Sequence, residues 1–340
     1  MKKLMAMVVM GMAAAGVASA QAGGWSVQRA VKVGGEGGFD YVVADSEARR
    51  LYVPRLGAQG RITVFKLDAE LKPEGVIEGV SAHGVAIDHA SGHGFASSNP
   101  VTMFDTEKLK VIKTIAVQGE PDGIMAADGR VYVFSHEAPN VTVLDAKDGS
   151  IVGTVDLGGA PEAAVSDGAH VYVDLEDKGA IGVFDVKTLK LVATYSLQGK
   201  GDGCAGLALD AAKGVLFATC RSPKVMVMVQ SSDGTVLGSV PIGGGTDGAV
   251  FDAATGEAIS ANGEGTLTMV KQDASGVYAV EQTVQTKLRA KTIALDEKKN
   301  KLYLVTADFT PPPANAPMVN GRPARGTMVP ESFVVLEVGR

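Results

Sequence analysis

The chain has 340 residues, a formal net charge of −6, 46% hydrophobic residues, 5% aromatic residues and 43 glycines. An acidic protein has no general attraction for phosphate backbones, so the charge argues against nonspecific binding of nucleic acids. The many glycines and the aliphatic apolar content favour short strands and tight turns, and an all-β chain of this length can form one domain.

The amino-terminal residues have the pattern of a secretory signal. Two lysines follow Met1, an apolar run covers residues 4–17, and Ala18, Ser19 and Ala20 form a cleavage site of the A-x-A type. We therefore expect residues 1–20 to be removed on export, leaving one domain over residues 21–340 in the periplasm or outside the cell. A membrane anchor is the alternative for this run, and we expect no membrane span after it.

An apolar strand that ends in an aspartate and a turn recurs seven times after the signal. The intervals between these aspartates are 39 to 44 residues. A repeat of about forty residues is typical of β-propellers, in which each repeat forms one blade. The closing aspartates are Asp45, Asp88, Asp128, Asp167, Asp210, Asp252 and Asp296.

Each repeat predicts four antiparallel strands in a constant order. The first strand and its turn precede a second strand such as "RLYV" or "RVYV", a third such as "VTVLD", and a fourth such as "VIKTIAV". A single four-stranded sheet would expose two faces and two edges, and stacking of seven sheets around an axis buries the faces. The expected fold is therefore a seven-bladed, all-β propeller with four-stranded antiparallel blades.

The two ends of the chain predict how the ring closes. The seventh repeat ends at its third strand, "SFVVLEV", and leaves no room for a fourth strand before Arg340. The segment "VQRAVKVGG", residues 27–35, has the pattern of a fourth strand and precedes the first repeat. We expect this amino-terminal strand to join the outer edge of the last blade.

The two cysteines of the chain fall in the fifth repeat. If residues 206–210 and 215–219 pair around the turn at 211–214, Cys204 and Cys220 lie opposite each other at the open end of the hairpin. In an oxidising compartment this register predicts a Cys204–Cys220 disulfide, and a pair of reduced thiols is the alternative.

The repeat resembles a known family, the YVTN-repeat seven-bladed propellers of the YncE-like periplasmic type. The resemblance rests on "LYV", "VYV" and "LYL" in the second strands, on "VTVLDAKDGSIVGTV", and on "GEPDG" and "GAPEA" before first strands. It implies a periplasmic propeller, and one member of the family binds single-stranded DNA. The sequence lacks the basic groove with interleaved aromatic residues that such binding requires, so we do not expect a nucleic-acid partner.

Polar residues recur where the innermost strands begin, and in a propeller these positions surround one mouth of the central channel. They predict a polar pocket for a cation, an amine-bearing ligand or a metal, or for a partner protein. The alternative is turn chemistry, in which the acids only accept backbone N–H groups. The innermost set is Asp40, His83, Asp122, Glu162, Ala205, Asp247 and Lys291, and loops after the second strands add Arg55, Asn99, His136, Glu176, Arg221, Asn262 and Asp308.

One interpretation of these residues is a binding site for a divalent metal ion. It would combine His83 with Asp122, Asp40 and His136 from neighbouring blades. The sequence has no short local motif such as H-E-x-x-H to support it. The remaining histidines, His89, His93 and His170, are predicted at turns on the opposite face.

A long Pro-rich segment over residues 308–332 replaces the short loop expected in the last blade. Long excursions from a compact domain are often functional. We expect it to lie over the channel face as a lid that brings Arg322 and Arg325 toward the acids, and a surface loop without such a role is the alternative.

Three functions are compatible with these patterns. The first is an exported monomer that binds a small polar ligand or a partner protein through the channel mouth without chemistry. The second is a metal-assisted hydrolase or lactonase that uses His83 as a base, and the sequence leaves open whether the protein is an enzyme. The third, single-stranded DNA binding, is implied only by the family resemblance.

Overall fold

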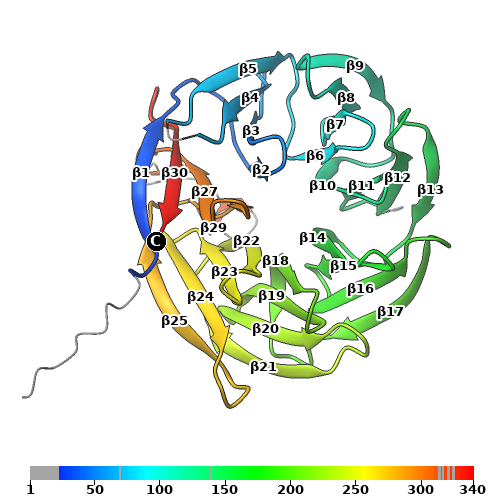
Figure 1. Ribbon diagram of the computed structural model, residues 1–340, viewed down its shortest axis with the longest axis vertical. Helices are drawn as coiled ribbons and strands as arrows, with labels where there is room; N and C mark the ends of the chain where they lie inside the picture. Colours follow the sequence, from blue (N-terminus) through cyan, green and yellow to red (C-terminus); the bar gives the residue numbers. More distant parts are fainter. Residues whose placement is uncertain are drawn as a thin grey trace, which may run out of the picture.

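The computed structural model describes residues 23–68, 70–137, 140–312, 315, 318–319, 322–323 and 326–340. Seven four-stranded antiparallel sheets follow one another around a central axis (Figure 1). The expected seven-bladed propeller is confirmed. The proposed signal peptide, residues 1–20, lies outside the described residues. No helix in the described part of the chain is long and apolar enough to cross a membrane.

The innermost strand of each blade lies nearest the axis in Figure 1. Each of these strands begins a blade in the chain and pairs with the strand that follows it. They are β2 Val43–Asp45, β6 Val85–Asp88, β10 Pro121–Ala127, β14 Pro161–Ser166, β18 Asp202–Asp210, β22 Thr246–Asp252 and β26 Ile293–Asp296.

The two middle strands of each blade carry most of the buried apolar side chains. The second strands are β3 Arg50–Arg55, β7 His93–Ala96, β11 Arg130–Ser135, β15 His170–Leu175, β19 Val215–Ser222, β23 Glu257–Asn262 and β27 Lys301–Thr306. The third strands are β4 Arg61–Lys66, β8 Val101–Asp105, β12 Val141–Asp145, β16 Ala180–Asp185, β20 Val225–Gln230, β24 Thr266–Gln272 and β30 Val334–Gly339.

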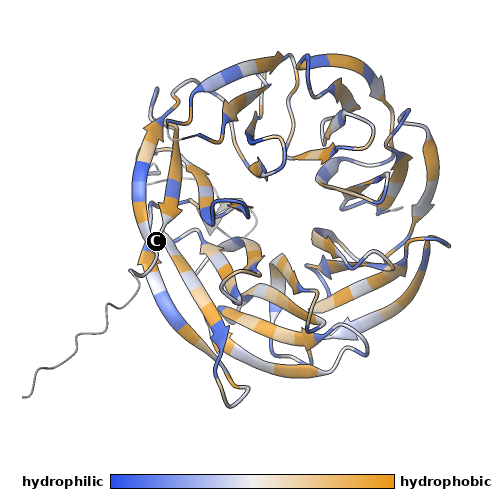
Figure 2. Cartoon of the chain, in the orientation of Figure 1, coloured by the Kyte–Doolittle hydropathy of each residue, from blue (hydrophilic) through white to orange (hydrophobic). Residues whose placement is uncertain are grey.

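The outermost strands have one exposed face and are more polar. They are β5 Pro73–Glu78, β9 Lys110–Ile115, β13 Ile151–Val155, β17 Lys190–Ser196, β21 Val236–Pro241, β25 Tyr278–Gln285 and β1 Ser26–Lys32. Hydrophobic stretches recur along the strands of every blade in Figure 2. Side chains from adjacent blades form shared clusters, as where Tyr52 of the first blade packs with Phe104 of the second.

The recurring aspartates stabilise the turns between first and second strands. The Asp45 carboxylate accepts the backbone N–H groups of Glu47 and Ala48, and Asp210 accepts those of Ala212 and Lys213. A short side-chain acceptor at this position satisfies donors that the turn would otherwise leave unpaired. Asp88, Asp167 and Asp252 accept turn N–H groups in the same way, which explains why an aspartate recurs at this position in most blades.

The amino-terminal strand closes the ring as predicted. Strand β1 pairs antiparallel with β30, from Ser26 opposite Gly339 to Lys32 opposite Val334, and forms the outer edge of the last blade. Trp25, which directly precedes β1, is only 2% exposed. Its indole N–H donates to Glu257 at 3.0 Å, and its backbone N–H donates to the Gln282 side chain at 2.9 Å. Both partners belong to the sixth blade, so the start of the chain ties two blades together.

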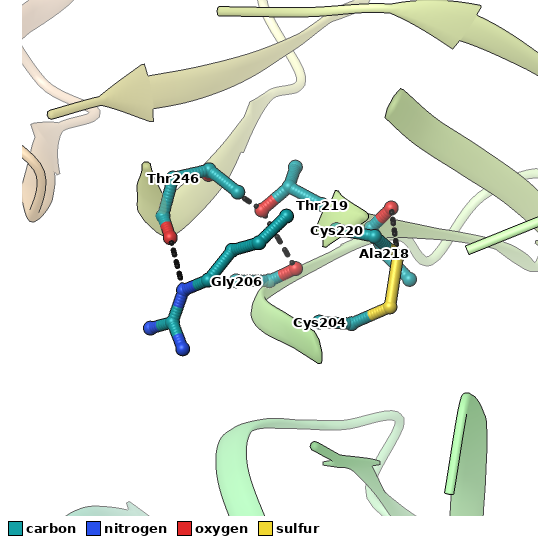
Figure 3. The surroundings of a disulfide bond; sticks show 7 residues. Cys204, Gly206, Ala218, Thr219, Cys220 and Thr246 are labelled. Atoms are coloured by element: carbon teal, nitrogen blue, oxygen red, sulfur yellow. Dashed lines mark hydrogen bonds between the residues drawn. A yellow bond between two sulfur atoms is a disulfide. The ribbon is translucent and has the colours of Figure 1, made fainter. Parts of the chain in front are cut away.

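The predicted disulfide between Cys204 and Cys220 is confirmed. The two residues lie opposite each other in the β18–β19 register, and both side chains are fully buried. Figure 3 shows the bond beside a hydrogen-bonded pair of threonines, in which Thr246 of the next blade donates to Thr219 at 2.9 Å. The disulfide therefore joins the first two strands of the fifth blade at the point where the sixth blade packs against them.

The base of the Pro-rich segment is anchored on the propeller. Phe309 pairs with Met328 across the base, and Thr310 and Thr327 exchange hydrogen bonds. Two short strands, β28 Met318–Val319 and β29 Arg322–Pro323, pair farther out. In projection this ribbon lies near β27 and β22 (Figure 1). The side chain of Arg322 and the whole of Arg325 lie outside the described residues, so the lid stays a prediction.

Candidate functional site

Irregular pairing at the start of the inner strands places side chains at the channel mouth. The register shifts between Pro121 and Ile124 in one blade and between Pro161 and Ala164 in the next. A bulge of this kind redirects a side chain out of the regular alternation. Corresponding shifts occur at Ala205 and Asp247, whereas Asp40, His83 and Lys291 precede their strands.

Two cations and three carboxylates form a continuous network on one side of the mouth. Lys291 contacts Asp247 and lies 3.3 Å from Asp40. Arg221 contacts Asp247 on its other side and pairs with Glu176 at 2.5 Å. These residues come from blades 4, 5, 6 and 7 and from the segment before β2. The positive charges of Lys291 and Arg221 are therefore compensated within the mouth.

His83 lies between two carboxylates on the other side. Its Nδ1 atom is 3.0 Å from Asp40 Oδ2 and 3.1 Å from Asp122 Oδ1. A single ring N–H can point at only one acceptor, and the well-directed hydrogen bond goes to Asp40. The buried Oδ1 atom of Asp122 accepts no hydrogen bond from the described residues. Among these residues, Asp122 therefore has only imidazoles as cationic neighbours, His83 at 3.1 Å and His136 at 3.8 Å.

The pKa values follow this arrangement. The hydrogen bond to Asp40 raises the pKa of His83, and burial raises the pKa of Asp122. Burial also acts to raise the pKa of Asp40, but the hydrogen bond from His83 and the charge of Lys291 outweigh it, and the pKa is lowered. The hydrogen bond between His83 and Asp40 therefore favours a protonated imidazole beside an ionised carboxylate.

Two groups of three side chains have the geometry to hold a metal ion. Asp40, His83 and Asp122 form one, and Asp122, His136 and Glu162 form the other, with the ligand atoms of each group within 4.8 Å of one another. Asp122 belongs to both groups. Imidazole with two carboxylates is a donor set suited to a divalent transition metal.

Glu162 lines a channel cavity of about 180 Å³. Burial and the neighbouring Glu176 raise the pKa of Glu162 to about 9. Tyr41 donates its O–H to Glu162 at 3.5 Å, and burial raises the pKa of this phenol well above its usual value. This environment favours the protonated form of the Glu162 carboxyl at neutral pH.

We expect the loss of this proton to make the protein less stable as the pH rises. A carboxyl whose pKa is higher in the folded than in the unfolded state contributes stability at low pH that is lost between about pH 4.5 and pH 9. The contribution is at most about 1.4 kcal/mol per pH unit. The unfolding free energy of the Glu162→Gln variant should therefore depend less on pH than that of the wild type. At pH 8 the variant should be the more stable of the two in denaturant titrations.

The control for this pH experiment is Glu107→Gln, which removes an exposed acid in a turn between third and fourth strands. This control should retain the slope of the wild type. Identical slopes for the wild type and Glu162→Gln would show that Glu162 is ionised in the folded protein.

Several predicted residues lie outside this cluster. Arg55 is buried, donates to the carbonyl groups of Gly34 and Gly37, and stacks on Phe333 at 3.8 Å. Asn262 is fully buried within its own blade and donates to Thr266 and Thr268.

Three further predicted positions contribute no group to the ion-pair network. Asn99 is exposed beside Pro100, and Asp308 pairs with Lys287 at 3.0 Å. Ala205 is buried and supplies no polar group.

Two residues of the site were not among the predicted ones. Tyr41 follows Asp40 directly and faces Glu162 in the channel, and Thr292 donates its hydroxyl to the Asp40 carbonyl at 2.6 Å. Thr292 is the residue after Lys291, so both missed residues are chain neighbours of predicted ones. Polar side chains next to each predicted position were the signal that could have revealed them.

No family model and no curated protein matches the sequence. The fold is shared with solved structures. A chain in the crystal structure of the mitotic checkpoint complex aligns with a TM-score of 0.69 and 12% identity, over 89% of this chain and 95% of that chain. The WD40 β-propeller domain of Doa1 aligns with a TM-score of 0.67 and 14% identity, over 92% and 97%.

A third similar structure is the hydrazine synthase of Kuenenia stuttgartiensis. It aligns with a TM-score of 0.67 and 13% identity, over 78% of this chain and 92% of that chain. At identities this low, the three likenesses establish the propeller architecture and carry no information about ligands or reactions.

Proposed function

We propose that the protein is an exported propeller of the YVTN type that binds a small cationic ligand, a divalent metal ion or an amine, at its channel mouth. The secretory pattern of residues 1–20 supports export, and the repeat motifs support the family. The fold supplies a rigid scaffold, and the ligand is bound by side chains from separate blades.

One observation carries this proposal, which is the excess of carboxyl groups over cationic groups at the mouth around Asp122. Five carboxyl groups meet at the mouth, those of Asp40, Asp122, Glu162, Glu176 and Asp247. Lys291 and Arg221 neutralise only part of this charge, even with Glu162 protonated. A cation that replaces the proton on His83 would be held by Asp40 and Asp122 together.

Cation binding should raise the melting temperature in a dose-dependent way. A ligand at one hundred times its dissociation constant stabilises the native state by about 2.7 kcal/mol. The measurement is thermal shift with Zn²⁺, Mn²⁺, Ca²⁺ and, separately, a primary amine such as butylamine. The response to the metals should strengthen from pH 6 to pH 8, because the proton on His83 competes with the metal.

The variants Asp122→Asn and His83→Ala should lose this response, and the exposed-site variant Glu107→Gln should keep it. A response to metals but not to butylamine would identify the cation as a metal. Metal-assisted hydrolysis requires such an ion at this site, so the absence of stoichiometric metal binding would exclude that function too. A flat response to every probe, or equal responses from wild type and Asp122→Asn, would contradict the proposal.

A further inference from the structure

A second cavity, of about 400 Å³, lies beside the mouth under the base of the Pro-rich segment. Its described walls come from the segment before β2, from loops of the sixth and seventh blades, and from Phe309 and Met328. Lys291 lines this cavity and also contacts the mouth. The volume is within the range of small-molecule sites.

The apolar wall of this cavity consists of two aromatic rings and a methionine. Phe39 and Phe309 lie with their ring centroids 6.3 Å apart and tilted by 50°, and Met328 pairs with Phe309 across the base of the Pro-rich segment. All three side chains also pack against the hydrophobic cluster between the first and last blades. The wall is therefore anchored on the core, and it presents flat apolar surface to an occupant.

The charged side chains among the described lining residues are both cations, Arg289 and Lys291. Lys291 also contacts Asp40 and Asp247 in the mouth, and Arg289 is the second cation of the lining. The Arg289 guanidinium stacks on the Phe309 ring at 3.7 Å. Such stacking fixes a planar fork of N–H donors beside an aromatic surface, which suits recognition of a carboxylate.

Glycines form another part of the wall and bring the backbone close to the cavity. Gly263 donates its N–H to Gly245 at 3.0 Å, and a Cβ atom on Gly263 would lie 2.9 Å from the Gly245 carbonyl oxygen. Gly245 itself has a φ of +70°. A Cβ atom here would collide with the facing loop, so the glycines allow the two loops that form this wall to approach closely.

We propose that this cavity binds a small organic anion with a flat apolar body, of the aromatic carboxylate class. The carboxylate pairs with Arg289, and the ring lies against Phe39, Phe309 and Met328. This site has the opposite charge preference to the mouth, and it is separate from the proposed cation site around Asp122.

Isothermal titration with benzoate tests the proposal, with benzamide and benzamidine as neutral and cationic probes of the same shape. Benzoate should bind the wild type at least about tenfold more tightly than either analogue, because a charge-assisted bidentate pair forms with benzoate alone. The Arg289→Gln variant should weaken benzoate binding by at least about tenfold, and Arg289→Lys should retain part of it.

The matched control is Lys287→Gln, which removes a neighbouring cation that pairs with Asp308. This control should bind benzoate like the wild type, as should Asp122→Asn, and the response to cations should persist in Arg289→Gln. Saturation-transfer NMR on the same samples should show contact with the benzoate ring, and this contact should decrease in Phe39→Leu. Equal binding of the three probes, or unchanged benzoate affinity in folded Arg289→Gln, would overturn the proposal.

Discussion

A chain that lacks residues 23–32 should fail to unfold cooperatively and should expose apolar surface at room temperature. This truncation removes β1 from the last blade, exposes the edge of β30, and removes Trp25 from the sixth blade. The single substitution Trp25→Ala should cost about 3–5 kcal/mol, since it empties a fully packed aromatic site. That loss is a large fraction of the usual stability of a folded domain.

The readouts for this first prediction are denaturant titration and binding of a dye specific for exposed apolar surface. Val27→Ala is the matched control, because Val27 belongs to the same strand but is 37% exposed. This variant should remain within about 0.5 kcal/mol of the wild type. If the truncated chain unfolded in one sharp transition, at the same denaturant midpoint as the wild type, the ring would close without β1.

Replacement of both cysteines by alanine should lower stability by about 3 kcal/mol. The disulfide closes a loop with a sequence separation of 16 residues, and a cross-link of that length restricts the unfolded chain to about this extent. The measurement is denaturant unfolding of the double variant beside the wild type. The folded wild type should resist added reductant, because both cysteines are fully buried.

A second effect of this cysteine replacement should be seen at the mouth. Arg221 directly follows Cys220, and its side chain donates to the Thr246 carbonyl at 3.1 Å. Loosening of this strand end should weaken the contacts of Arg221 with Asp247 and Glu176 and alter the thermal response to cations. If the wild type were no more stable than the double alanine variant, with or without reductant, the disulfide would have no structural role.

The fold was predictable because its determinants are local and repeated. Most closing aspartates, such as Asp45 and Asp210, serve a turn in their own blade, and each apolar strand faces an equivalent neighbour, so one correct repeat predicts the others. The missing fourth strand of the last repeat and the extra strand at residues 27–35 then defined the closure. The cysteine pairing followed from the same hairpin register.

The site was predictable only in part. The innermost positions belong to the repeat, which is why Asp40, His83, Asp122, Glu162, Asp247 and Lys291 were found together. The residues from the loops after the second strands reach the mouth only if they lie on one particular side of the strand end. The repeat does not determine that side. Arg55 and Asn262 are the last residues of their second strands, and both point into packed surroundings. The cavity beside Arg289 depends on Phe309 and Met328 at the base of the Pro-rich segment, which has no counterpart in the other repeats.

Ala205 is the one innermost position without a polar group, and Arg221 of the same blade reaches the mouth beside it. Arg221 and Lys291 consequently both flank Asp247, whereas His83, Asp122 and His136 lie on the side of the second and third blades. The two sides of the opening therefore differ in chemistry, with salt-bridged cations on one side and imidazole and carboxylate groups on the other. An elongated molecule with unlike ends would enter it in a preferred orientation.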